Sequence, residues 1–444
     1  MSALDAPVPR AEPPFADRRR AVIVVALAIF SVSIAYLTWR GLVRGLANSS
    51  DLVVGYAAGQ AWLLGHDPYD VAVLVREALS IGGPDTPVRH LDRLLNVYFP
   101  TTLPIFVPLS LLSWPDARLT WLSLNLVSTV FIALGVARLS GWGVMAVRTL
   151  AFSSVVFALA PVHTTMSLGQ TAVLATGCLV GALMLERSGH PRAAGLLYAL
   201  ATAVKIQIGL PFLAYLVWRR RWETTFHAAL WLIGITVLSV VRMELANIAW
   251  FESWTANLGL LSGPGGLNDP GRLNSDRYSL ISLEYPLHSL FAHASWVSLI
   301  SAAVIAALAA AFAWIVRVRD ILPDLLSFGI VAVLGLLATY HRYYDAVLLV
   351  LPIAWAISTL GTSRWREGTL ALVLCADFLL PAQTALNELQ QRGFIPDWLA
   401  DSLVWESVLM AQHAWALVLL AILLLRAAVR TARIPEAEPL VDPA

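Results

Sequence analysis

Three groups of ionisable side chains stand inside or beside long apolar runs of this sequence, where they are candidates for chemistry. Asp51 follows the first apolar run, residues 21–39, by 12 residues. Lys205 stands in the middle of an apolar segment, ALATAVKIQIGLPF, with no carboxylate close to it in the sequence. Residues 340–345, YHRYYD, combine three phenols with an imidazole, a guanidinium and a carboxylate. Because an ionisable group at membrane depth costs about 2.5 to 3.5 kcal/mol on insertion scales, each group calls for a reason.

The cationic groups suggest a phosphate ligand. Lys205 would act on a phosphate as a point charge, and the alternative is that it snorkels or pairs with an acidic residue from another helix. His341 and Arg342 suit a phosphate or a sugar leaving group. Their alternative is an ordinary aromatic belt at a helix end with a salt-bridged cap. We expect Asp345 to orient its basic neighbours and not to act as a base.

Asp51 is the carboxylate that is freest for catalysis, although it has three rivals in Asp67, Asp70 and Glu284. Asp67 precedes a proline and is typical of a residue that fixes a turn. Asp70 is typical of the N-cap of the helix that follows it. The alternative role for Asp51 is to cap its own amphipathic segment, residues 52–64.

A glycine-rich stretch, residues 263–271, is followed by residues 272–279, RLNSDRYS. Amide and hydroxyl groups of this kind bind sugar hydroxyls, and Asn274 is the candidate among them. The glycines favour a lid over a site, and disorder of the loop is the alternative.

The elements that must position these residues are membrane helices. The chain has 444 residues, of which 58% are hydrophobic and 13% charged, and its mean hydropathy is +0.71. A water-soluble protein of this size could not cover so much apolar surface. The apolar runs are continuous, whereas barrel strands alternate over about 10 residues. We therefore predict an all-α, polytopic membrane protein with about ten to thirteen membrane helices, residues 21–433, between a disordered cytoplasmic N-terminus, residues 1–20, and a disordered tail, residues 434–444.

The placement of basic residues predicts the orientation in the membrane. Arginines 18–20 put the N-terminus in the cytoplasm, and Asp51 therefore lies on the other side. Further basic clusters, all expected to be cytoplasmic together with the C-terminus, lie at 186–192, 218–222, 317–319, 364–366 and 426–433. The polar segments expected outside are the loop with Asp51 and residues 163–170, 247–293, 341–345 and 381–405.

Two segments do not fit a simple membrane helix. Residues 193–218 have basic flanks at both ends, so we expect two half-length helices that meet at a polar apex at Lys205. Residues 98–114 contain prolines at 100, 104 and 108, and they are expected to form a short or re-entrant helix.

Several common motifs are absent from the sequence. It has no Walker-type P-loop, no G-x-S-x-G elbow, no H-E-x-x-H motif and no dinucleotide fingerprint. Cys178 and Cys375 both stand in apolar runs and indicate neither a disulfide framework nor a metal site. We therefore expect no cofactor, no metal, no nucleic acid partner and no ATP-driven transport.

A set of short motifs falls in a characteristic order between residues 51 and 352. The first motif is Asp51 with Tyr56, Ala57 and LLGHDPY at 63–69, and the second is Tyr98-Phe99-Pro100 with Pro108, Trp121 and Asn125. The third is Leu168-Gly169-Gln170, and the fourth is residues 195–205 with Pro211 and residues 219–222. The fifth is residues 341–344. This order resembles the GT-C superfamily of polyprenyl-phosphate-sugar-dependent glycosyltransferases, and in particular glycosyltransferase family 87 with its mycobacterial phosphatidylinositol mannoside mannosyltransferase and arabinofuranosyltransferase group. Phe99-Pro100-Thr101 departs from the usual Tyr-Pro-Pro, which concerns the local helix geometry and not the chemistry.

The resemblance implies an enzyme of the cell membrane that moves a sugar from a polyprenyl-phosphate donor to a hydroxyl of a glycolipid or glycan on the extracytoplasmic side, with inversion at the anomeric carbon. Asp51 matches the family's aspartate in the first outer loop, the general base. Lys205 and His341 match positions near the donor phosphate, and Arg342 would join them. The residues expected to bind substrate are Tyr56, Tyr69, Gln170, Asn274 and Tyr344. Mannose is the first choice of sugar and arabinofuranose the second.

The rival interpretation is a transporter or flippase for a polar or lipid-linked solute. Transporters more often show repeated halves with matching broken helices, and this sequence shows no convincing internal repeat. A structural membrane subunit without activity is a third interpretation, and it would leave Asp51 and Lys205 unexplained.

Overall fold

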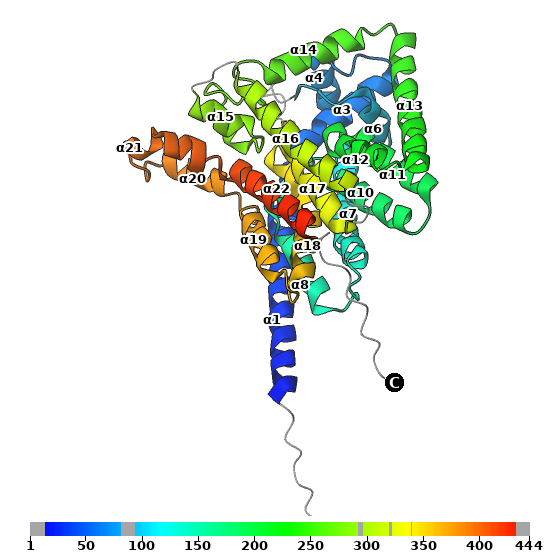
Figure 1. The fold of residues 1–444 in the computed structure, drawn as a ribbon. Helices are drawn as coiled ribbons and strands as arrows, with labels where there is room; N and C mark the ends of the chain where they lie inside the picture. Colours follow the sequence, from blue (N-terminus) through cyan, green and yellow to red (C-terminus); the bar gives the residue numbers. More distant parts are fainter. Residues whose placement is uncertain (1–13, 81–93, 292–295, 319–321, 339, 432–444) are drawn as a thin grey trace, which may run out of the picture.

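The computed structural model describes residues 14–80, 94–291, 296–318, 322–338 and 340–431. Within these ranges the chain folds into helices, and its extended pairing is limited to an isolated antiparallel bridge between Leu280 and Arg342. The prediction of an all-α protein is confirmed (Figure 1). The first helix begins at Pro14, so residues 14–20 are helical where we expected disorder. The remaining parts of the two expected disordered ends, residues 1–13 and 434–444, lie outside the described residues.

The helices before the middle of the chain are α1 (Pro14–Leu37), the π-helix η1 (Thr38–Val43), α2 (Arg44–Ala47), α3 (Ser50–Leu64), α4 (Val71–Ser80), the 3-10 helix η3 (Pro100–Thr102), α6 (Leu103–Ser110), α7 (Trp114–Leu139), α8 (Val147–Ala158), α9 (Ala160–Leu168), α10 (Ala172–Arg187), α11 (Pro191–Val204) and α12 (Ile206–Trp218). The later ones are α13 (Trp222–Leu245), α14 (Trp250–Ser262), the 3-10 helix η4 (Arg277–Ser279), α15 (Glu284–Leu290), α16 (Val297–Val318), α17 (Asp324–Ala338), the 3-10 helix η5 (Tyr343–Leu349), α18 (Val350–Thr359), α19 (Trp365–Ala376), α20 (Ala382–Gln391), α21 (Asp397–Ala400), the π-helix η6 (Trp405–Leu409) and α22 (Gln412–Thr431).

Membrane-length helices are fewer than the apolar runs of the sequence. Five described helices are long and apolar enough to cross a membrane, namely Arg20–Ala47, Trp114–Leu139, Trp222–Leu245, Val297–Val318 and Gln412–Thr431. A sixth span results if α8 and α9, which meet at a bend of 48°, are counted together. Three further apolar helices are shorter: Ile206–Trp218, Asp324–Ala338 and Tyr343–Thr359. With the bent pair and the three shorter helices, the described residues give nine candidate segments, fewer than the expected ten to thirteen membrane helices.

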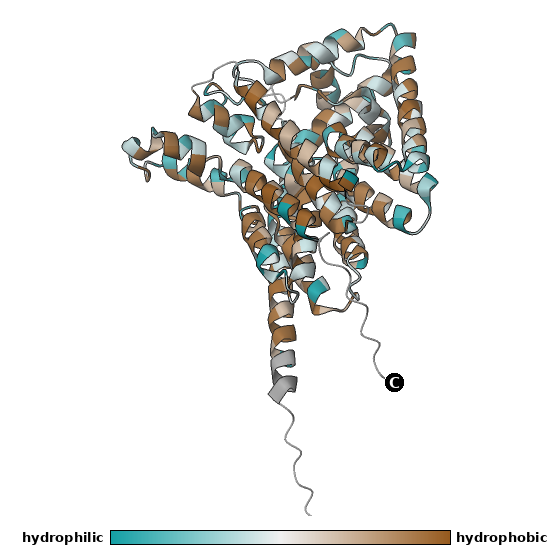
Figure 2. Cartoon of the chain, viewed as in Figure 1, coloured by the Kyte–Doolittle hydropathy of each residue, from teal (hydrophilic) through white to brown (hydrophobic). Residues whose placement is uncertain are grey.

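Hydrophobic residues, brown in Figure 2, occur along most of the helices, and many of them are exposed on the outside of the protein. On α13, Phe226, Leu230 and Leu238 are each more than half exposed, and on α16 the same holds for Leu299 and Trp314. A surface of this kind suits the acyl chains of a bilayer and is unusual in a protein that faces water. The structure thus supports the assignment to the membrane independently of composition.

Helices α11 and α12 form the interrupted segment that we predicted over residues 193–218. They meet at Lys205, whose backbone is extended, with φ −154° and ψ 94°. The hydroxyls of Thr101 and Thr102 donate to the carbonyl of Ala203, at 3.1 and 2.9 Å. They therefore satisfy a backbone oxygen close to the break, which makes the interruption tolerable inside a membrane protein.

The proline-containing segment 98–114 forms η3 and α6, both short as predicted. At eight residues, α6 is too short to cross a bilayer. It packs closely against α3, because a Cβ atom added to Gly55 would lie 2.5 Å from the ring of Phe106. A glycine at this position therefore lets the two helices approach each other.

The two longer segments that we expected to be loops contain helices, which is a correction. Residues 247–293 include α14, η4 and α15, and residues 381–405 include α20 and α21. The signal for α14 is a stripe of apolar residues that recurs every three or four positions, at 250, 254, 258 and 261. In Figure 1, α14 lies across the top of the molecule at a steep angle to α13, and α1 projects from the bottom.

Candidate active site

A cavity of about 520 Å³ lies where α3, the loop before η3, the junction of α11 and α12, α14 and residues 340–344 come together. Five of the predicted site residues line this cavity: Asp51, Gln170, Lys205, Arg342 and Tyr344. The structure thus gathers in one place residues that the sequence separates by almost 300 positions.

Lys205 projects from the break between α11 and α12 and is buried, with 3% of its side chain exposed. Its Nζ lies 2.5 Å from Oδ1 of Asp345 and 3.3 Å from Oε1 of Gln170. The same Nζ lies 4.4 Å from the centroid of the Tyr344 ring. Of the alternatives that we left open for Lys205, pairing with an acidic residue from another helix is therefore correct. Since an ammonium has three N–H donors, this pairing still leaves one of them for a ligand.

His341 stands behind Asp345 and is fully buried. Its Nδ1 lies 2.9 Å from Oδ2 of Asp345. Because an ionised carboxylate only accepts hydrogen bonds, Nδ1 carries the proton. The other ring nitrogen, Nε2, has no partner among the described residues. His341 is not among the cavity-lining residues; it contacts Asp345, and Asp345 contacts Lys205. Its contact with a donor phosphate stays a prediction.

Asp51 lies in the first turn of α3 and contacts the amide of Gln170, which donates from Nε2 to Oδ2 at 2.5 Å. The hydroxyl of Ser50 donates to the other carboxylate oxygen, Oδ1, at 3.2 Å. The residue that precedes α3 is Ser49, and no side chain caps the helix there. The alternative role that we gave Asp51, a helix cap, is therefore not what the contacts favour.

Two left-handed turns bring Asp51 and Gln170 together. Ser49 has φ +47°, and its N–H donates to the carbonyl of Ser167 at 3.1 Å. Gly169 has φ +76°, and a Cβ atom there would lie 2.7 Å from Cβ of Leu52. Glycine alone fits such a close approach at positive φ without strain. The start of α3 is therefore locked against the turn that carries Gln170.

The rival carboxylates have the structural roles that we predicted for them. Oδ1 of Asp67 accepts from the N–H of Tyr69 at 2.9 Å, which fixes the turn. Oδ1 of Asp70 accepts from the N–H groups of Ala72 and Val73, at 2.7 and 3.4 Å, and so caps α4. Glu284 begins α15 and does not line the cavity.

Three residues that we expected to bind substrate do not line this cavity, and their role in binding stays a prediction. Tyr56 is buried, and its hydroxyl donates to the carbonyl of Leu112 at 2.6 Å. Tyr69 is buried as well, and its hydroxyl donates to the carbonyl of Tyr98 at 3.1 Å. The amide of Asn274 donates within its own loop. All three thus support the walls and do not form them.

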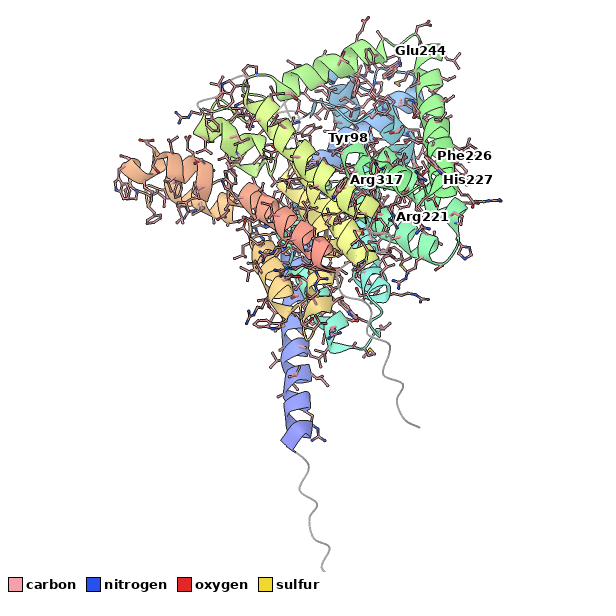
Figure 3. The ribbon with its side chains drawn as sticks, in the orientation of Figure 1. Tyr98, Arg221, Phe226, His227, Glu244 and Arg317 are labelled. Atoms are coloured by element: carbon pink, nitrogen blue, oxygen red, sulfur yellow. The ribbon has the colours of Figure 1, made fainter. Side chains whose placement is uncertain are left out.

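Tyr98 and the cavity face of α14 belong to the site, although we did not predict either. In Figure 3, Tyr98 lies inside the body of the protein, below α14 in this view. Its hydroxyl donates to Oε1 of Gln170 at 3.4 Å. Burial, followed by the negative charges of Asp51 and Asp345, raises the pKa of the Tyr98 phenol far above its usual value, so it remains a neutral donor. Trp254, Leu258 and Leu261 of α14 give the cavity one apolar wall.

The glycine-rich loop lies at the cavity, which favours a lid over disorder for this stretch. Leu267 and Asn268 line the cavity, and the guanidinium of Arg342 donates to the carbonyl of Leu267. Within the loop, the carboxylate of Asp269 accepts from the N–H groups of Gly265 and Gly271, both at 2.7 Å. These bonds give the loop a defined internal order.

The polar lining of the cavity contains two cations, Lys205 and Arg342, and carboxylates lie near them. Asp51 and Asp276 line the cavity itself, and Asp345 contacts it through Lys205. In the ranges that the structure describes, no three side chains of His, Cys, Asp or Glu gather closely enough to hold a metal ion. The arrangement places a carboxylate, that of Asp51, and an ammonium, that of Lys205, at the two ends of the Gln170 amide.

Comparison with known proteins identifies a family for more than half of the chain. The model of glycosyltransferase family 87 matches residues 96–339. The matched range contains Gln170 and Lys205, whereas Asp51 precedes it and His341 follows it. No curated protein and no solved structure matches the chain.

Proposed function

The chain belongs to glycosyltransferase family 87, and we propose that it is an inverting transferase that moves a sugar from a polyprenyl-phosphate donor to a hydroxyl of a glycolipid or glycan. The observation that carries this proposal is the cavity in which Asp51 and Lys205 are joined by the side chain of Gln170. A base at one end and a cation at the other suit the attack of a hydroxyl and the departure of a phosphate. The family is one of transferases, so the alternative of a transporter or flippase is not favoured.

In the proposed reaction, Asp51 takes the proton of the acceptor hydroxyl as its oxygen attacks the anomeric carbon. The new carbon–oxygen bond forms while the bond to the phosphate oxygen breaks, and the electron pair leaves with the phosphate. The negative charge that develops there is stabilised by the third N–H of Lys205 and by Arg342. Asp345 is engaged by Lys205 and His341. Of the two carboxylates that line the cavity, Asp51 and Asp276, only Asp51 is joined to Lys205 through Gln170 in the described contacts, so we assign the base to Asp51. A single displacement then inverts the configuration.

The walls of the cavity divide between polar and apolar groups, which supports a lipid-borne substrate. Trp254, Leu258 and Leu261 of α14 line the same cavity as Gln170 and Lys205. A polyprenyl phosphate needs both an apolar surface and cationic donors. This division does not identify the sugar, and we keep mannose as the first choice and arabinofuranose as the second.

The position of the cavity along α13 supports an extracytoplasmic site. Figure 3 shows Arg221 and Glu244 at opposite ends of this helix, which is long enough to cross a membrane. The cavity lies toward the Glu244 end, where α14 follows, and arginines 219–221 stand at the other end. By the positive-inside rule, those arginines and both termini lie in the cytoplasm. A membrane-impermeant thiol reagent applied to intact cells should then label Ser275→Cys but not Arg220→Cys, and the reverse pattern would contradict this orientation.

Transfer of radiolabelled sugar by the purified protein tests the proposed activity. We expect transfer from polyprenyl-phosphate mannose, and Asp51→Asn should lower the rate by about 100-fold or more, because the base is lost. Asp70→Asn is the matched control, since the same chemical change is made at a helix cap outside the cavity. A panel that includes polyprenyl-phosphate arabinofuranose decides the sugar. Absence of transfer from every such donor, or full activity of Asp51→Asn, would contradict the proposal.

A further inference from the structure

Among the described contacts, the side chain of Gln170 is the one that bonds to both Asp51 and Lys205. The sequence suggested that Gln170 binds substrate, and these contacts suggest a different role. We propose that Gln170 is a positioning residue that holds one oxygen of the Asp51 carboxylate and leaves the other oxygen to take the proton. This inference rests on the proposed function, in which Asp51 is the base. It is carried by three contacts of one buried amide, to Asp51, Lys205 and Tyr98.

The chemistry of the neighbours fixes the orientation of the amide. The ammonium of Lys205 only donates hydrogen bonds, so it requires the carbonyl oxygen of Gln170, and the phenol of Tyr98 donates to the same oxygen. The ionised carboxylate of Asp51 only accepts, so it requires the amino group. A flipped amide would place its amino group against the ammonium and its oxygen against the carboxylate. A single orientation therefore satisfies all three neighbours, which makes Gln170 a directional connection.

The backbone leaves the side chain little freedom to lie elsewhere. The N–H of Gln170 donates to the carbonyl of Thr165 at 2.8 Å, and the indole of Trp121 donates to the carbonyl of Gly169 at 2.9 Å. Only 5% of Gln170 is exposed. Since Gly169 also touches Leu52, the turn before Gln170 is in contact with the first turn of α3, which carries Asp51. Gln170 thus acts on Asp51 from a rigid base.

The consequence is a division of labour between the two oxygens of Asp51. Oδ2 is held by the amide at 2.5 Å, and Oδ1 has the hydroxyl of Ser50 at 3.2 Å. The longer of the two contacts is the easier one to give up to an acceptor hydroxyl. Oδ1 is therefore the oxygen that receives the proton, and Gln170 sets the direction from which the acceptor must approach.

Steady-state kinetics of two variants of similar shape test this role in the full-length protein. Gln170→Glu keeps the size of the side chain and removes the amino donor, and Gln170→Leu removes all polar contacts. We expect kcat to fall by about 10- to 100-fold in both, with the KM for polyprenyl-phosphate mannose and for the acceptor changed by less than about 3-fold, because a misplaced base slows the chemical step. A raised KM with an unchanged kcat would instead show that Gln170 binds substrate, and it would overturn the proposal. Full activity of Gln170→Glu would also overturn it.

A double-mutant cycle with Asp51→Glu distinguishes positioning of the base from a general weakening of the structure. Asp51→Glu keeps a carboxylate but displaces it by one methylene, so the side chain at position 170 can no longer form the same hydrogen bond to it. If Gln170 acts through Asp51, the effect of Gln170→Leu should shrink by at least about 5-fold in the Asp51→Glu background, and full additivity would overturn the proposal. The elution volume and the thermal midpoint of each variant check its folding, and Gln170→Glu replaces Gln170→Leu in the cycle if the leucine variant does not fold. If Asp51→Asn and Asp51→Glu are both fully active, the proposed function fails; if they are impaired while the Gln170 variants are not, only this inference fails.

Discussion

Two cavities of similar size lie toward opposite ends of α13, and both are lined by charged residues. The cavity that contains Asp51 measures about 520 Å³, and the second, which contains Glu186, Arg187, Arg219, Arg221 and Asp324, about 630 Å³. Their ion pairs differ. Lys205 and Asp345 lie 2.5 Å apart with 3% and 2% of their side chains exposed, whereas Arg221 and Glu186 lie 3.6 Å apart and 58% of Arg221 is exposed. Volume and charge are therefore alike in the two cavities, and the burial of their ion pairs is what differs.

The backbone around the two cavities differs in the same way. Lys205 stands between two helices, Asp345 lies in a 3-10 helix, and Asp51 and Gln170 follow closely after residues with positive φ. In the second cavity, Glu186 and Arg187 end a regular helix, α10, and the positive φ of Arg220, +55°, belongs to the short turn between α12 and α13 and not to the interior of an apolar run. Irregular backbone inside a membrane protein is costly, and it persists where a ligand or a cavity requires it. If the irregular backbone serves a ligand, changes near Lys205 should affect activity and stability more than changes at the second cavity.

The largest effect is expected from breaking the buried ion pair. Asp345→Asn leaves the Lys205 ammonium without its carboxylate in a dry environment, and we expect a loss of about 3 to 5 kcal/mol in the free energy of unfolding. The thermal midpoint in detergent and the yield of monodisperse protein measure it. The double variant Lys205→Met, Asp345→Asn removes both charges and should recover most of this stability while remaining inactive. A stable single variant would show that the pair is not as dry as its burial indicates.

The next effect concerns Arg342, the second cation of the cavity. Arg342→Gln removes a charged donor, and we expect kcat/KM for the polyprenyl-phosphate donor to fall by about 10- to 100-fold, which corresponds to a charge-assisted hydrogen bond of about 1.5 to 3 kcal/mol. Kinetics at varied donor concentration measure this loss. Arg272→Gln, which removes an exposed arginine that pairs with Glu406 outside the cavity, is the matched control and should retain its kinetics. An equal loss in both variants would point to the loop and not to the cavity.

A smaller effect is expected from crowding the helix break. A Cβ atom added to Gly209 would lie 2.2 Å from Oγ1 and 2.5 Å from Cα of Thr202, so Gly209→Ala should cost about 1 to 3 kcal/mol through overpacking of α11 against α12. Gly234→Ala is the control within a regular helix, α13, where a Cβ atom meets nothing within 4 Å, and it should be neutral or slightly stabilising. Thermal unfolding compares the two. If both variants behave alike, the two halves of the broken helix are not tightly packed.

The smallest effect is expected at the second cavity. Arg221→Gln breaks a long, exposed ion pair, and we expect a change of less than about 1 kcal/mol in stability and no change in transfer activity. The same thermal and kinetic assays apply. A clear loss of activity in this variant would remove the distinction between the two cavities.

Part of the site could be predicted from sequence because some side chains are exceptional where they stand. Lys205 interrupts an apolar run, and residues 340–345 combine several kinds of polar group. The helix break at Lys205 and the second cation, Arg342, could therefore both be predicted. Their partners were not visible, since the bond between Asp51 and Gln170 joins residues 119 positions apart. The partner of Tyr56 was not visible for the same reason, because the carbonyl that accepts from its hydroxyl belongs to Leu112, 56 positions away. Local patterns show that a polar group needs a partner, and tertiary contacts decide which partner it meets.

The helix α14 was missed because a loop was expected, and its position has a consequence for the supply of reactants. Trp254 and Leu261 of α14 line the cavity, while Phe251 and Leu260 are 58% and 63% exposed on its outer side. Exposed apolar groups on the outer side of α14 suit contact with the acyl chains of a bilayer. Reactants with lipid tails would then arrive sideways, by diffusion in two dimensions, and turnover would follow their mole fraction in the bilayer and not their amount per volume of buffer.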